Sequence, residues 1–418
     1  MKDYTQLLKQ ELLPAMGCTE PIAIALCAAK AVELLGQPLE KMQVFCSGNI
    51  IKNVKSVLVP HGEGLYGIEA AAALGCFGGK ASLGLEVLRD ADQPALLQAK
   101  AFIRSGAISV HHAKGIESLF IRIIVFAKDQ SAEAHISRSH HHFSFLRHNE
   151  TILLQEQEEP EGMALQEELN FQDILDFSRQ LETLKDAELL KLLQNQADCN
   201  LLIAREGLQG DYGASIGKTL LKAYPGQASA RLRAYASAGS DARMAGSPMT
   251  VVINSGSGNQ GMTVSLPLVI YAQDHSMPDL KLFQALALSN LLAIYMKTLI
   301  GKMSAFCGVV SAAAGAGAGL CYLQGKGADD MVQVIATTLL TSGGIFCDGA
   351  KASCASKIAI AIENALLAIE MQKQGHSLPP QQGLAGRDID ETILNIGRAA
   401  KEGMHMTDEV ILDIMINP

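Results

Sequence analysis

The chain has 418 residues, of which 48% are hydrophobic and 18% are charged. This length suits two or three packed structural units. The composition supplies enough apolar residues for a large core, so the chain as a whole is not disordered. The formal net charge of −9 argues against sequence-independent binding to nucleic acid. No apolar signal segment follows Met1, so we expect a cytoplasmic protein whose nine cysteines are thiols rather than a disulfide framework.

Two long uncharged stretches raise the question of a membrane span. Residues 247–273 contain several side-chain amides and two prolines, which suit a lipid environment poorly. Residues 303–325 are long enough to cross a bilayer, but Ala, Gly and Ser dominate them and their transfer energy is modest. We therefore predict a buried helix at 303–325 and no contact with a membrane.

The first part of the chain predicts a mixture of helices and strands. A helix at 4–35 is broken at 16–21, where Thr19 is a good N-cap and Pro21 suits a first helical turn. The remaining elements that we expect here are strands over 42–59 with a turn at 48–49, one or two buried helices over 64–88, and short antiparallel strands at 119–127, 132–137, 143–147 and 151–154.

An acidic stretch at 155–168 carries six glutamates without periodicity, which predicts a solvated linker or an exposed loop. Beyond it helices dominate, and we expect them at 173–183, 187–193, 201–204, 215–223, 280–300, 309–323, 329–340, 353–374 and 391–402. The exception is an apolar, strand-like run at 249–254. The predicted fold class is α+β, with a small domain of antiparallel sheet and helices at 1–154 and a larger, mainly helical domain at 155–418.

The run at 249–254 leads into a loop, 255–261, whose three glycines match the spacing of the dinucleotide-binding fingerprint. We reject a dinucleotide site because Pro267 interrupts the helix that must follow and no second strand comes after it. The loop also lacks the Gly-Lys-Ser/Thr ending of a nucleoside triphosphate site. Two interpretations stay open: a tight turn, or a nest of backbone N–H groups that holds an anion such as a substrate carboxylate.

The cysteines differ in their surroundings. Cys347 and Cys354 are either metal ligands or small buried residues, and one pair cannot close a metal site. Cys354 and Cys307 lie near helix starts, where the helix dipole favours thiolate, but spacing alone does not bring them together. Cys18 precedes a capped helix start, so we expect a lowered pKa and a role as base, nucleophile or ligand, against the alternative of a small capping residue. The other cysteines are expected to be packing residues: Cys27, Cys46, Cys76, Cys199 and Cys321.

Four motifs in combination resemble the L-cysteine desulfidase family, which is related to the alpha chains of iron–sulfur L-serine dehydratases. They are Gly-Cys-Thr-Glu-Pro at 17–21, Ser-Asp-Ala-Arg-Met at 240–244, Asn-Ser-Gly-Ser-Gly-Asn-Gln-Gly at 254–261 and Cys-Asp-Gly-Ala at 347–350. The resemblance runs over almost the whole chain. It implies a carbon–sulfur lyase that converts L-cysteine to pyruvate, ammonia and hydrogen sulfide with a [4Fe–4S] cluster instead of pyridoxal phosphate.

The resemblance also assigns roles to residues. It implies that the cluster is bound by Cys307, Cys347 and Cys354, that Cys18 is the catalytic base, and that the glycine-rich loop binds the substrate. The substrate-binding residues that we expect are Asn254, Ser255, Gly256, Ser257, Gly258, Asn259 and Gln260 of the loop, with Asn49, Lys52 and Asn53 on a polar rim. The triplet at 140–142 departs from the Gly-His-Thr-Asn of many relatives, which leaves the role of His140 open; an exposed polar strand face is the alternative.

Ser240, Asp241 and Arg243 are further candidates for the site, although Arg243 is equally well explained as a structural ion pair. Three thiolates leave one iron of a cluster without a protein ligand, and that iron can act as a Lewis acid on the leaving group. We expect a small amino-acid substrate and leave a homodimer open. The alternatives are an iron–sulfur L-serine dehydratase, a pyridoxal phosphate lyase, for which no lysine stands out beside the loop, and a non-catalytic iron–sulfur or thiol sensor.

Overall fold

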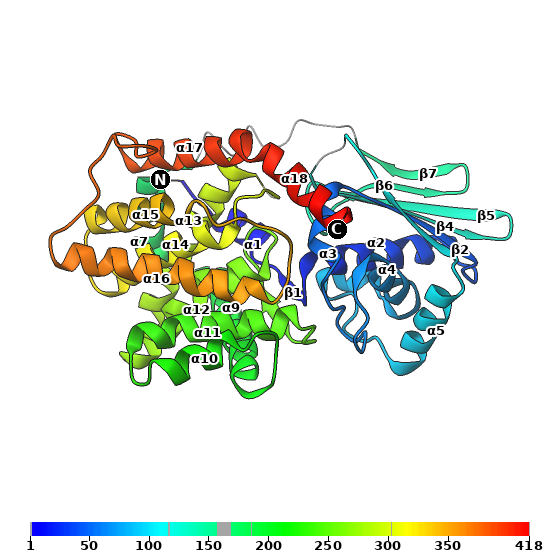
Figure 1. The fold of residues 1–418 in the computed structure, drawn as a ribbon, viewed down its shortest axis with the longest axis horizontal. Helices are drawn as coiled ribbons and strands as arrows, with labels where there is room; N and C mark the ends of the chain where they lie inside the picture. Colours follow the sequence, from blue (N-terminus) through cyan, green and yellow to red (C-terminus); the bar gives the residue numbers. More distant parts are fainter. Residues whose placement is uncertain (1, 116–117, 157–168, 185, 302, 418) are drawn as a thin grey trace.

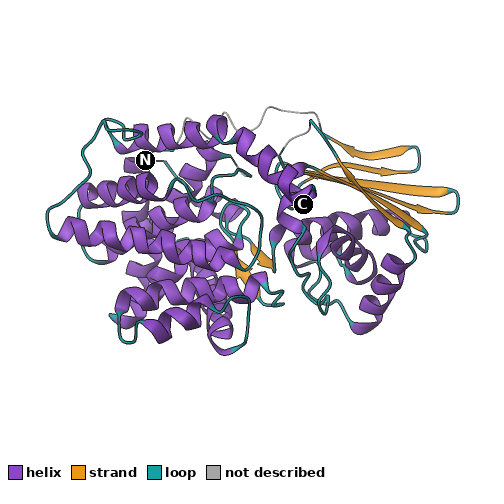
Figure 2. Ribbon diagram, in the orientation of Figure 1, coloured by secondary structure: helices purple, strands orange, loops and turns teal. Residues whose placement is uncertain are grey.

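The computed structural model describes residues 2–115, 118–156, 169–184, 186–301 and 303–417. It consists of a smaller part that contains a sheet and a larger part that is almost entirely helical (Figures 1 and 2). The predicted α+β fold class is therefore confirmed. Most of the acidic stretch predicted as a linker, residues 157–168, lies outside the described residues.

The smaller part is built on a sheet of six strands in the order β3-β2-β4-β5-β6-β7. Its strands are β2 (Lys41–Cys46), β3 (Ile108–His112), β4 (Phe120–Ala127), β5 (Gln130–Ser137), β6 (Phe143–His148) and β7 (Thr151–Gln155). All neighbours are antiparallel except β2 and β3, which are parallel. Alternate residues of β4, among them Ile121 and Ile123, are buried, because one face of the sheet packs on helices (Figure 2).

The helices of the smaller part are α2 (Thr19–Leu35), α3 (Gly48–Val54), α4 (Gly67–Gly78), α5 (Gln93–Arg104) and the short 3₁₀ turn η1 (Ala81–Glu86). Helix α2 is buried along most of its length because it lies between α4 and the strands β4 and β5. The strand predicted to continue through residue 54 is wrong: after Ser47 the chain turns into α3, which buries Ile50 and Val54, four residues apart, on one face. Strand β3 and helix α5 were not anticipated.

The larger part is a bundle around two buried helices, α12 (Gly258–Asp274) and α14 (Gly308–Leu323). The elements around them are α1 (Thr5–Glu11), α7 (Phe171–Arg179), α8 (Leu181–Leu184), α9 (Ala187–Gln209), α10 (Ile216–Ala223), α11 (Ala228–Met244), α13 (Asp279–Ile300), α15 (Ala328–Ser342), α16 (Ser353–Lys373), α17 (Ile389–Arg398), the π-turn η2 (Ala399–Gly403) and α18 (His405–Ile416).

Three expectations for this part are corrected. Helix α12 runs straight through Pro267, since its burial against α11, α13 and α14 outweighs the hydrogen bond that proline cannot make. The two segments predicted at 187–193 and 201–204 are one continuous helix, α9. Helices α11 and α18 were missed; α11 is so rich in Ala, Ser and Gly that its apolar periodicity is weak.

Both ends of the chain cross between the two parts. Strand β1 (Pro14–Met16) pairs antiparallel with β8 (Thr250–Val252) of the larger part. Figure 1 shows α18, in red, running from the helical part to α3, where the C-terminus lies. The boundary between residues 154 and 155 stays a prediction, but the segments at both termini join the two parts.

One described helix, α13, is long and apolar enough to cross a membrane by length and composition alone. Within the fold, 78% of the apolar window of α13 is buried. The core helix of a soluble protein passes the same test, so this feature is weak evidence for a membrane span.

Glu133 lies at the centre of a charge cluster on the outer face of the sheet. Arg122 Nε donates to its carboxylate over 2.6 Å, His135 Nε2 lies 2.7 Å from it, and Arg147 donates to the second oxygen. Burial alone would raise the pKa of Glu133, but His135 and the two arginines outweigh burial and lower it to about 2.

The Glu133→Gln substitution is therefore expected to lower the free energy of unfolding at neutral pH by about 1–2 kcal/mol, since both arginines are partly exposed and solvent-screened. A lowered carboxyl pKa contributes stability above the ordinary value of 4.5 that is lost as the pH falls towards about 2. Urea unfolding between pH 7 and pH 2 measures this, with Glu150→Gln in an exposed turn as the control. If Glu133→Gln and Glu150→Gln have the same free energy of unfolding at pH 7, the ion pairs of Glu133 do not stabilise the fold.

Candidate active site

A small cavity of about 90 Å³ lies where the two parts of the protein meet. Most of the residues predicted from the sequence line it, although they come from six separate segments of the chain: Cys18, Lys52, Asn53, Ser255, Gly256, Ser257, Asn259, Gln260, Cys307, Cys347 and Cys354. Pockets that take drug-sized ligands measure roughly 300–1,000 Å³, so this cavity suits a much smaller molecule.

Four helices begin at the wall of this cavity. Cys18, Ser257 and Cys307 are the N-cap residues of α2, α12 and α14, and Cys354 lies in the first turn of α16. The N-terminus of a helix carries a partial positive charge and N–H groups that have no partner within the helix. Four such ends therefore make the cavity favourable for anions and thiolates.

Backbone pairing brings Cys307 and Cys347 together. Phe306 and Phe346 form an isolated antiparallel bridge. On either side of it, the N–H of Cys307 donates to Ile345 O over 3.1 Å and the N–H of Cys347 donates to Ala305 O over 2.6 Å. Two segments 40 residues apart thus run side by side and present their cysteines to the same cavity.

The turn between Cys347 and Cys354 is fixed by ion pairs. The carboxylate of Asp348 pairs with the ammonium groups of Lys351 and Lys357. Gly349 has a φ of +91°, and a Cβ atom there would lie 2.4 Å from the carbonyl oxygen of Lys52, so only glycine fits. The turn therefore packs against the end of α3 and returns Cys354 to the cavity.

The three thiols influence one another's ionisation. The Cys307 thiol lowers the pKa of Cys347, with further help from the ammonium groups of Lys52 and Lys297, whereas the pKa of Cys307 is raised. Within the described residues, no group of three or more His, Cys, Asp or Glu side chains is arranged to hold a single metal ion. Three thiols around one cavity beside two buried lysines fit the donor set and the negative charge of a thiolate-bound cluster.

Cys18 does not have the lowered pKa expected from its place at a helix start. It is buried, and its thiol lies 3.0 Å from the carboxylate of Glu20. Burial and the neighbouring charge of Glu20 raise the pKa of Cys18 well above its ordinary value, and the opposing effect of Arg243 is smaller. At neutral pH the proton is therefore on the sulfur.

Glu20 was overlooked in the sequence, although it belongs to the Gly-Cys-Thr-Glu-Pro motif. Its carboxylate accepts a hydrogen bond from Asn53 Nδ2 over 2.8 Å, and it lies 3.1 Å from Thr19 Oγ1 and 4.0 Å from His140 Nε2. Burial would raise the pKa of Glu20, but His140, the Cys18 thiol and Arg243 together lower it. A partly buried, ionised carboxylate therefore lies beside the protonated Cys18 thiol.

His140 lies in the turn between β5 and β6 and lines the cavity, so the interpretation of the histidine triplet as an exposed strand face is wrong for this residue. His141 is exposed, and His142 Nε2 lies 2.7 Å from Glu156.

Gly256, in the glycine-rich loop, has a φ of +76°, and a Cβ atom there would lie 2.8 Å from His140 Nδ1. The loop and the histidine turn thus approach closely across the boundary of the two parts.

Only some residues of the glycine-rich loop line the small cavity. Ser257 caps α12, and Thr19 Oγ1 donates to Gly256 O over 2.7 Å, which ties the loop to the start of α2. Asn254 points away from the cavity, because its amide donates to Asn290 Oδ1 over 2.9 Å. Gly258 does not line the cavity either. Strand β8 before the loop pairs only with β1, antiparallel, among the described strands, whereas a dinucleotide site needs a parallel sheet.

Arg243 lies at the end of α11 and faces the cavity. It is 2% exposed, and its Nη1 donates to Asn259 Oδ1 over 3.3 Å. Arg243 Nε and Gln260 Oε1 are buried without a hydrogen-bond partner among the residues that the structure describes. The interpretation as a structural ion pair is not supported within the same residues, since no carboxylate pairs with Arg243. Buried polar groups of this kind indicate that a polar ligand completes the site.

The neighbouring candidates lie elsewhere. Asp241 accepts from the backbone N–H of Gly217 over 3.1 Å, and neither it nor Ser240 lines the cavity. Asn49 lies on the larger cavity described below. These residues are not brought to the small cavity.

Lys297 was also missed by the sequence analysis. It is buried near the end of α13 and makes no hydrogen bond or ion pair with any other described residue. The signal was present in the sequence, because Lys297 is the only charged residue in the stretch 282–301. A lone charge in a buried apolar helix commonly marks a functional position. Lys297 also lies beside the glycine-rich loop, where the sequence analysis expected no lysine.

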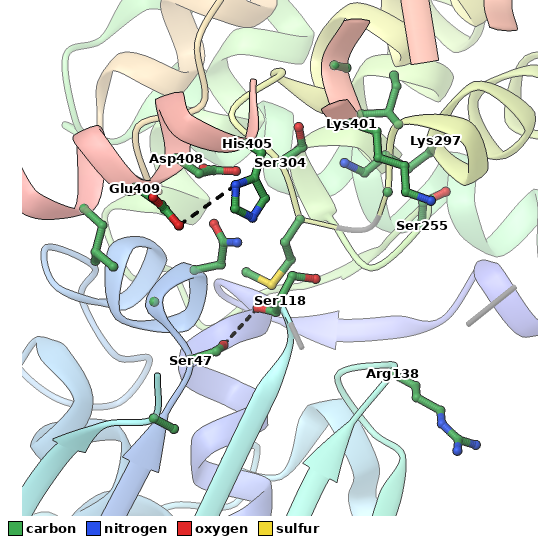
Figure 3. Close-up of a pocket in the computed structure, with 18 of the residues that line it drawn as sticks. Ser47, Ser118, Arg138, Ser255, Lys297, Ser304, Lys401, His405, Asp408 and Glu409 are labelled. Carbon is green, nitrogen blue, oxygen red and sulfur yellow. Dashed lines mark hydrogen bonds and ion pairs between the residues drawn. The ribbon is translucent and has the colours of Figure 1, made fainter. Parts of the chain in front are cut away.

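A second, larger cavity of about 1,190 Å³ adjoins the first, and we call it the vestibule. Both cavities are lined by Ser255, Lys297, Met303 and Ser304. Figure 3 shows Lys297, Ser255 and Ser304 on the helical side of the vestibule and Ser47 and Ser118 on the sheet side. Helix α18 borders it through residues such as Asp408, which also pairs with the buried Lys52.

Comparison with known proteins identifies the family. Residues 94–413 match the family model described as serine dehydratase alpha chain. The chain belongs to this family. Two relatives, each called "UPF0597 protein", are 42% identical: one from Desulfitobacterium hafniense over 99% of this chain and 96% of its own length, and one from Lachnoclostridium phytofermentans over the full length of both chains. A third from Finegoldia magna is also 42% identical over the full length of both.

Family membership confirms the predicted relation to iron–sulfur serine dehydratase alpha chains. The protein is therefore a serine dehydratase-like lyase of an iron–sulfur-dependent family. The match covers Cys307, Cys347, Cys354, Arg243 and the glycine-rich loop, whereas Cys18 and Glu20 lie before it.

Substitution of a predicted cluster ligand gives a direct test of this cavity. Cys347→Ala is expected to remove most of the iron and acid-labile sulfide bound after anaerobic reconstitution. The reason is that the two remaining thiols do not retain a cluster that needs three cysteine ligands. Cys321→Ala is the matched control, since Cys321 is buried near the far end of α14. Full iron content in the Cys347 variant would remove Cys347 from the ligand set.

Proposed function

We propose that this protein is an L-cysteine desulfidase that carries out β-elimination of L-cysteine to pyruvate, ammonia and hydrogen sulfide. The proposal rests chiefly on one observation. Three cysteines, the Cys18–Glu20 pair and the glycine-rich loop surround a single cavity of about 90 Å³. The group proposed at Cys307, Cys347 and Cys354 is a [4Fe–4S] cluster, which supplies a Lewis-acidic iron for the leaving group when bound.

The surroundings of the three thiols favour sulfur as the leaving atom. Phe306, Val309, Met303 and Ala350 line the cavity and offer no hydrogen-bonding side chain, so the donors beside the thiols are few and include Lys297 and Ser304. A leaving hydroxide needs strong hydrogen-bond donors, whereas a leaving thiolate is larger and less dependent on them. Burial lowers the pKa of Lys297 and the neighbouring Cys347 and Cys307 oppose this effect, so negative charge that develops on this side of the cavity favours the protonated lysine.

The opposite side of the cavity suits the carboxylate of an amino acid. Arg243 presents Nε without a partner among the described residues, and a guanidinium binds a carboxylate in a two-point, charge-assisted arrangement. Asn259 and Gln260, at the start of α12, add an amide and a helix N-terminus. These groups orient the substrate with its α-proton towards Cys18.

Cys18 and Glu20 together provide the base. The protonated thiol cannot accept the α-proton, so it must first pass its own proton to Glu20, whose oxygen lies 3.0 Å away. Arg243 stabilises the thiolate that forms, whereas His140 stabilises the carboxylate and therefore opposes the transfer. Release of the thiol from Cβ leaves aminoacrylate, which tautomerises and hydrolyses to pyruvate and ammonia.

An L-serine dehydratase is the second candidate, and the description of the matching family favours it. The same carboxylate-binding and base residues would serve L-serine, and only the leaving group would change. A pyridoxal phosphate lyase finds a lysine in Lys297, which lines both cavities, and borohydride trapping separates this candidate from the proposed one. The cytoplasmic location and the amino-acid partner expected from the sequence remain part of the proposal.

Substrate preference tests the proposal. After anaerobic reconstitution, kcat/KM for L-cysteine, followed as sulfide release, is expected to exceed that for L-serine, followed as pyruvate, by at least about tenfold. A preference for L-serine would identify a serine dehydratase. Bound iron without turnover of either amino acid would identify a non-catalytic sensor.

The role of the Cys18–Glu20 pair is tested by two substitutions. Cys18→Ser and Glu20→Gln are each expected to lower kcat by about 10²–10⁴-fold while the iron content is kept, because general-base catalysis contributes that much. Cys199→Ser, at a half-buried position outside the cavity, is the control. Wild-type kcat in the Cys18 variant would exclude this thiol as the base, and a Glu20 variant with an unchanged pH–rate profile would exclude the proton exchange.

A further inference from the structure

The vestibule is more than ten times larger than the cavity that it adjoins. L-Cysteine is proposed to bind in the small cavity, and nothing in the proposed function uses the vestibule. The two spaces meet at Ser255, Lys297, Met303 and Ser304, so a molecule held in the small cavity can extend through this neck.

The position of the neck determines which end of a substrate faces the vestibule. Met303 and Ser304 lie four and three residues before Cys307 in the chain, and Lys297 lies close enough to Cys307 and Cys347 to interact with them electrostatically. The three predicted cluster cysteines line only the small cavity, and so do the groups that suit the α-carbon end: Cys18, Glu20, Asn53, Arg243, Asn259 and Gln260. Of these two sets, the cluster cysteines lie nearer to the neck because of their relation to Met303, Ser304 and Lys297, so the leaving-group end of the substrate faces the neck.

The vestibule has an apolar wall next to the neck. Ile294 and Ile300 of α13 contribute to it beside Met303, and Leu7 of α1 and Leu412 of α18 add further apolar surface. Two acidic side chains of α18 have neighbours: Asp408 pairs with Lys52, and Glu409 lies 3.9 Å from His405 (Figure 3). Other charged residues, such as Lys401 and Asp413, also line the vestibule, so the apolar surface is confined to the wall next to the neck. An aliphatic or aromatic group is thus favoured here by burial of its apolar surface.

We infer that the enzyme also accepts L-cysteines that carry an aliphatic or aryl substituent on sulfur, with the substituent lying in the vestibule. This inference rests on the proposed function, because it uses the same base and carboxylate-binding residues. It extends the substrate class from free L-cysteine to cysteine thioethers.

The reaction balances without a further reactant. The base takes the α-proton, the electron pair forms the Cα–Cβ double bond, and the Cβ–S bond breaks with its electrons on sulfur. The sulfur takes up a proton and leaves as the substituted thiol. Aminoacrylate then reacts with water, so that one thioether and one water give one thiol, pyruvate and ammonia.

Turnover of S-methyl-, S-propyl- and S-benzyl-L-cysteine by the reconstituted enzyme, with L-cysteine in parallel, tests the inference. We expect thiol and pyruvate in equal amounts from each. Ala113 lines the vestibule but not the small cavity, so Ala113→Phe narrows only the larger space. It is expected to lower kcat/KM for S-benzyl-L-cysteine by about 10-fold or more and to leave that for L-cysteine unchanged, with Ala113→Ser as the matched control.

Binding provides a second measurement that is independent of turnover. S-Benzyl-α-methyl-L-cysteine lacks the α-proton and cannot eliminate, so calorimetry gives its Kd directly. It is expected to bind the reconstituted enzyme more tightly than α-methyl-L-cysteine does, and Ala113→Phe is expected to abolish the difference. Leu412→Trp narrows the vestibule from α18 and is expected to act in the same way if Ala113→Phe fails to fold.

The outcomes separate the two proposals. Sulfide release from L-cysteine, without thiol from any thioether and without tighter binding of the benzyl analogue, overturns the inference and leaves the proposed function intact. Turnover of thioethers that is equal in Ala113→Phe and wild type also overturns it, since the vestibule is then not used. Failure of L-cysteine and all thioethers to react overturns the proposed function and this inference together.

Discussion

The convergence of four helix N-termini on one buried cavity is the constraint on which the rest of the site depends. The starts of α2, α12, α14 and α16 create a positive field in a space from which most water is excluded. Buried Lys52, Lys297 and Arg243 add full charges to it. This arrangement favours negative groups at its centre, of which the Glu20 carboxylate is one.

This constraint explains why the site lies between the two parts of the protein. Cys18, Glu20 and Asn53 come from the smaller part, whereas the three predicted cluster cysteines come from the larger one. The pairing of β1 with β8 and the contact of α18 with α3 hold the parts together. In the proposed function, the protein thus joins a base from one part to a cluster site on the other, with the leaving-group side next to the vestibule.

The sequence predicted the elements with clear periodicity and the motifs with unusual composition. It predicted strands β4–β7 and most helices of the larger part, and it named the cysteines and loop residues that the fold brings together. It missed α11 because Ala and Ser carry little amphipathic pattern, and it stopped α12 at Pro267 because burial is invisible in a local pattern. The raised pKa of Cys18 could not be predicted either, since it arises from burial and from Glu20, whereas helix position alone predicts the opposite.

The central claim is that Cys307, Cys347 and Cys354 hold one cluster that has a single iron open to the substrate. Mössbauer spectroscopy of protein reconstituted anaerobically with ⁵⁷Fe, before and after addition of L-cysteine, tests it most directly. The account predicts the spectrum of a [4Fe–4S] cluster in which one iron of the four differs from the others and changes when L-cysteine binds. A spectrum without such a cluster, or one in which no iron site responds to L-cysteine, would contradict it.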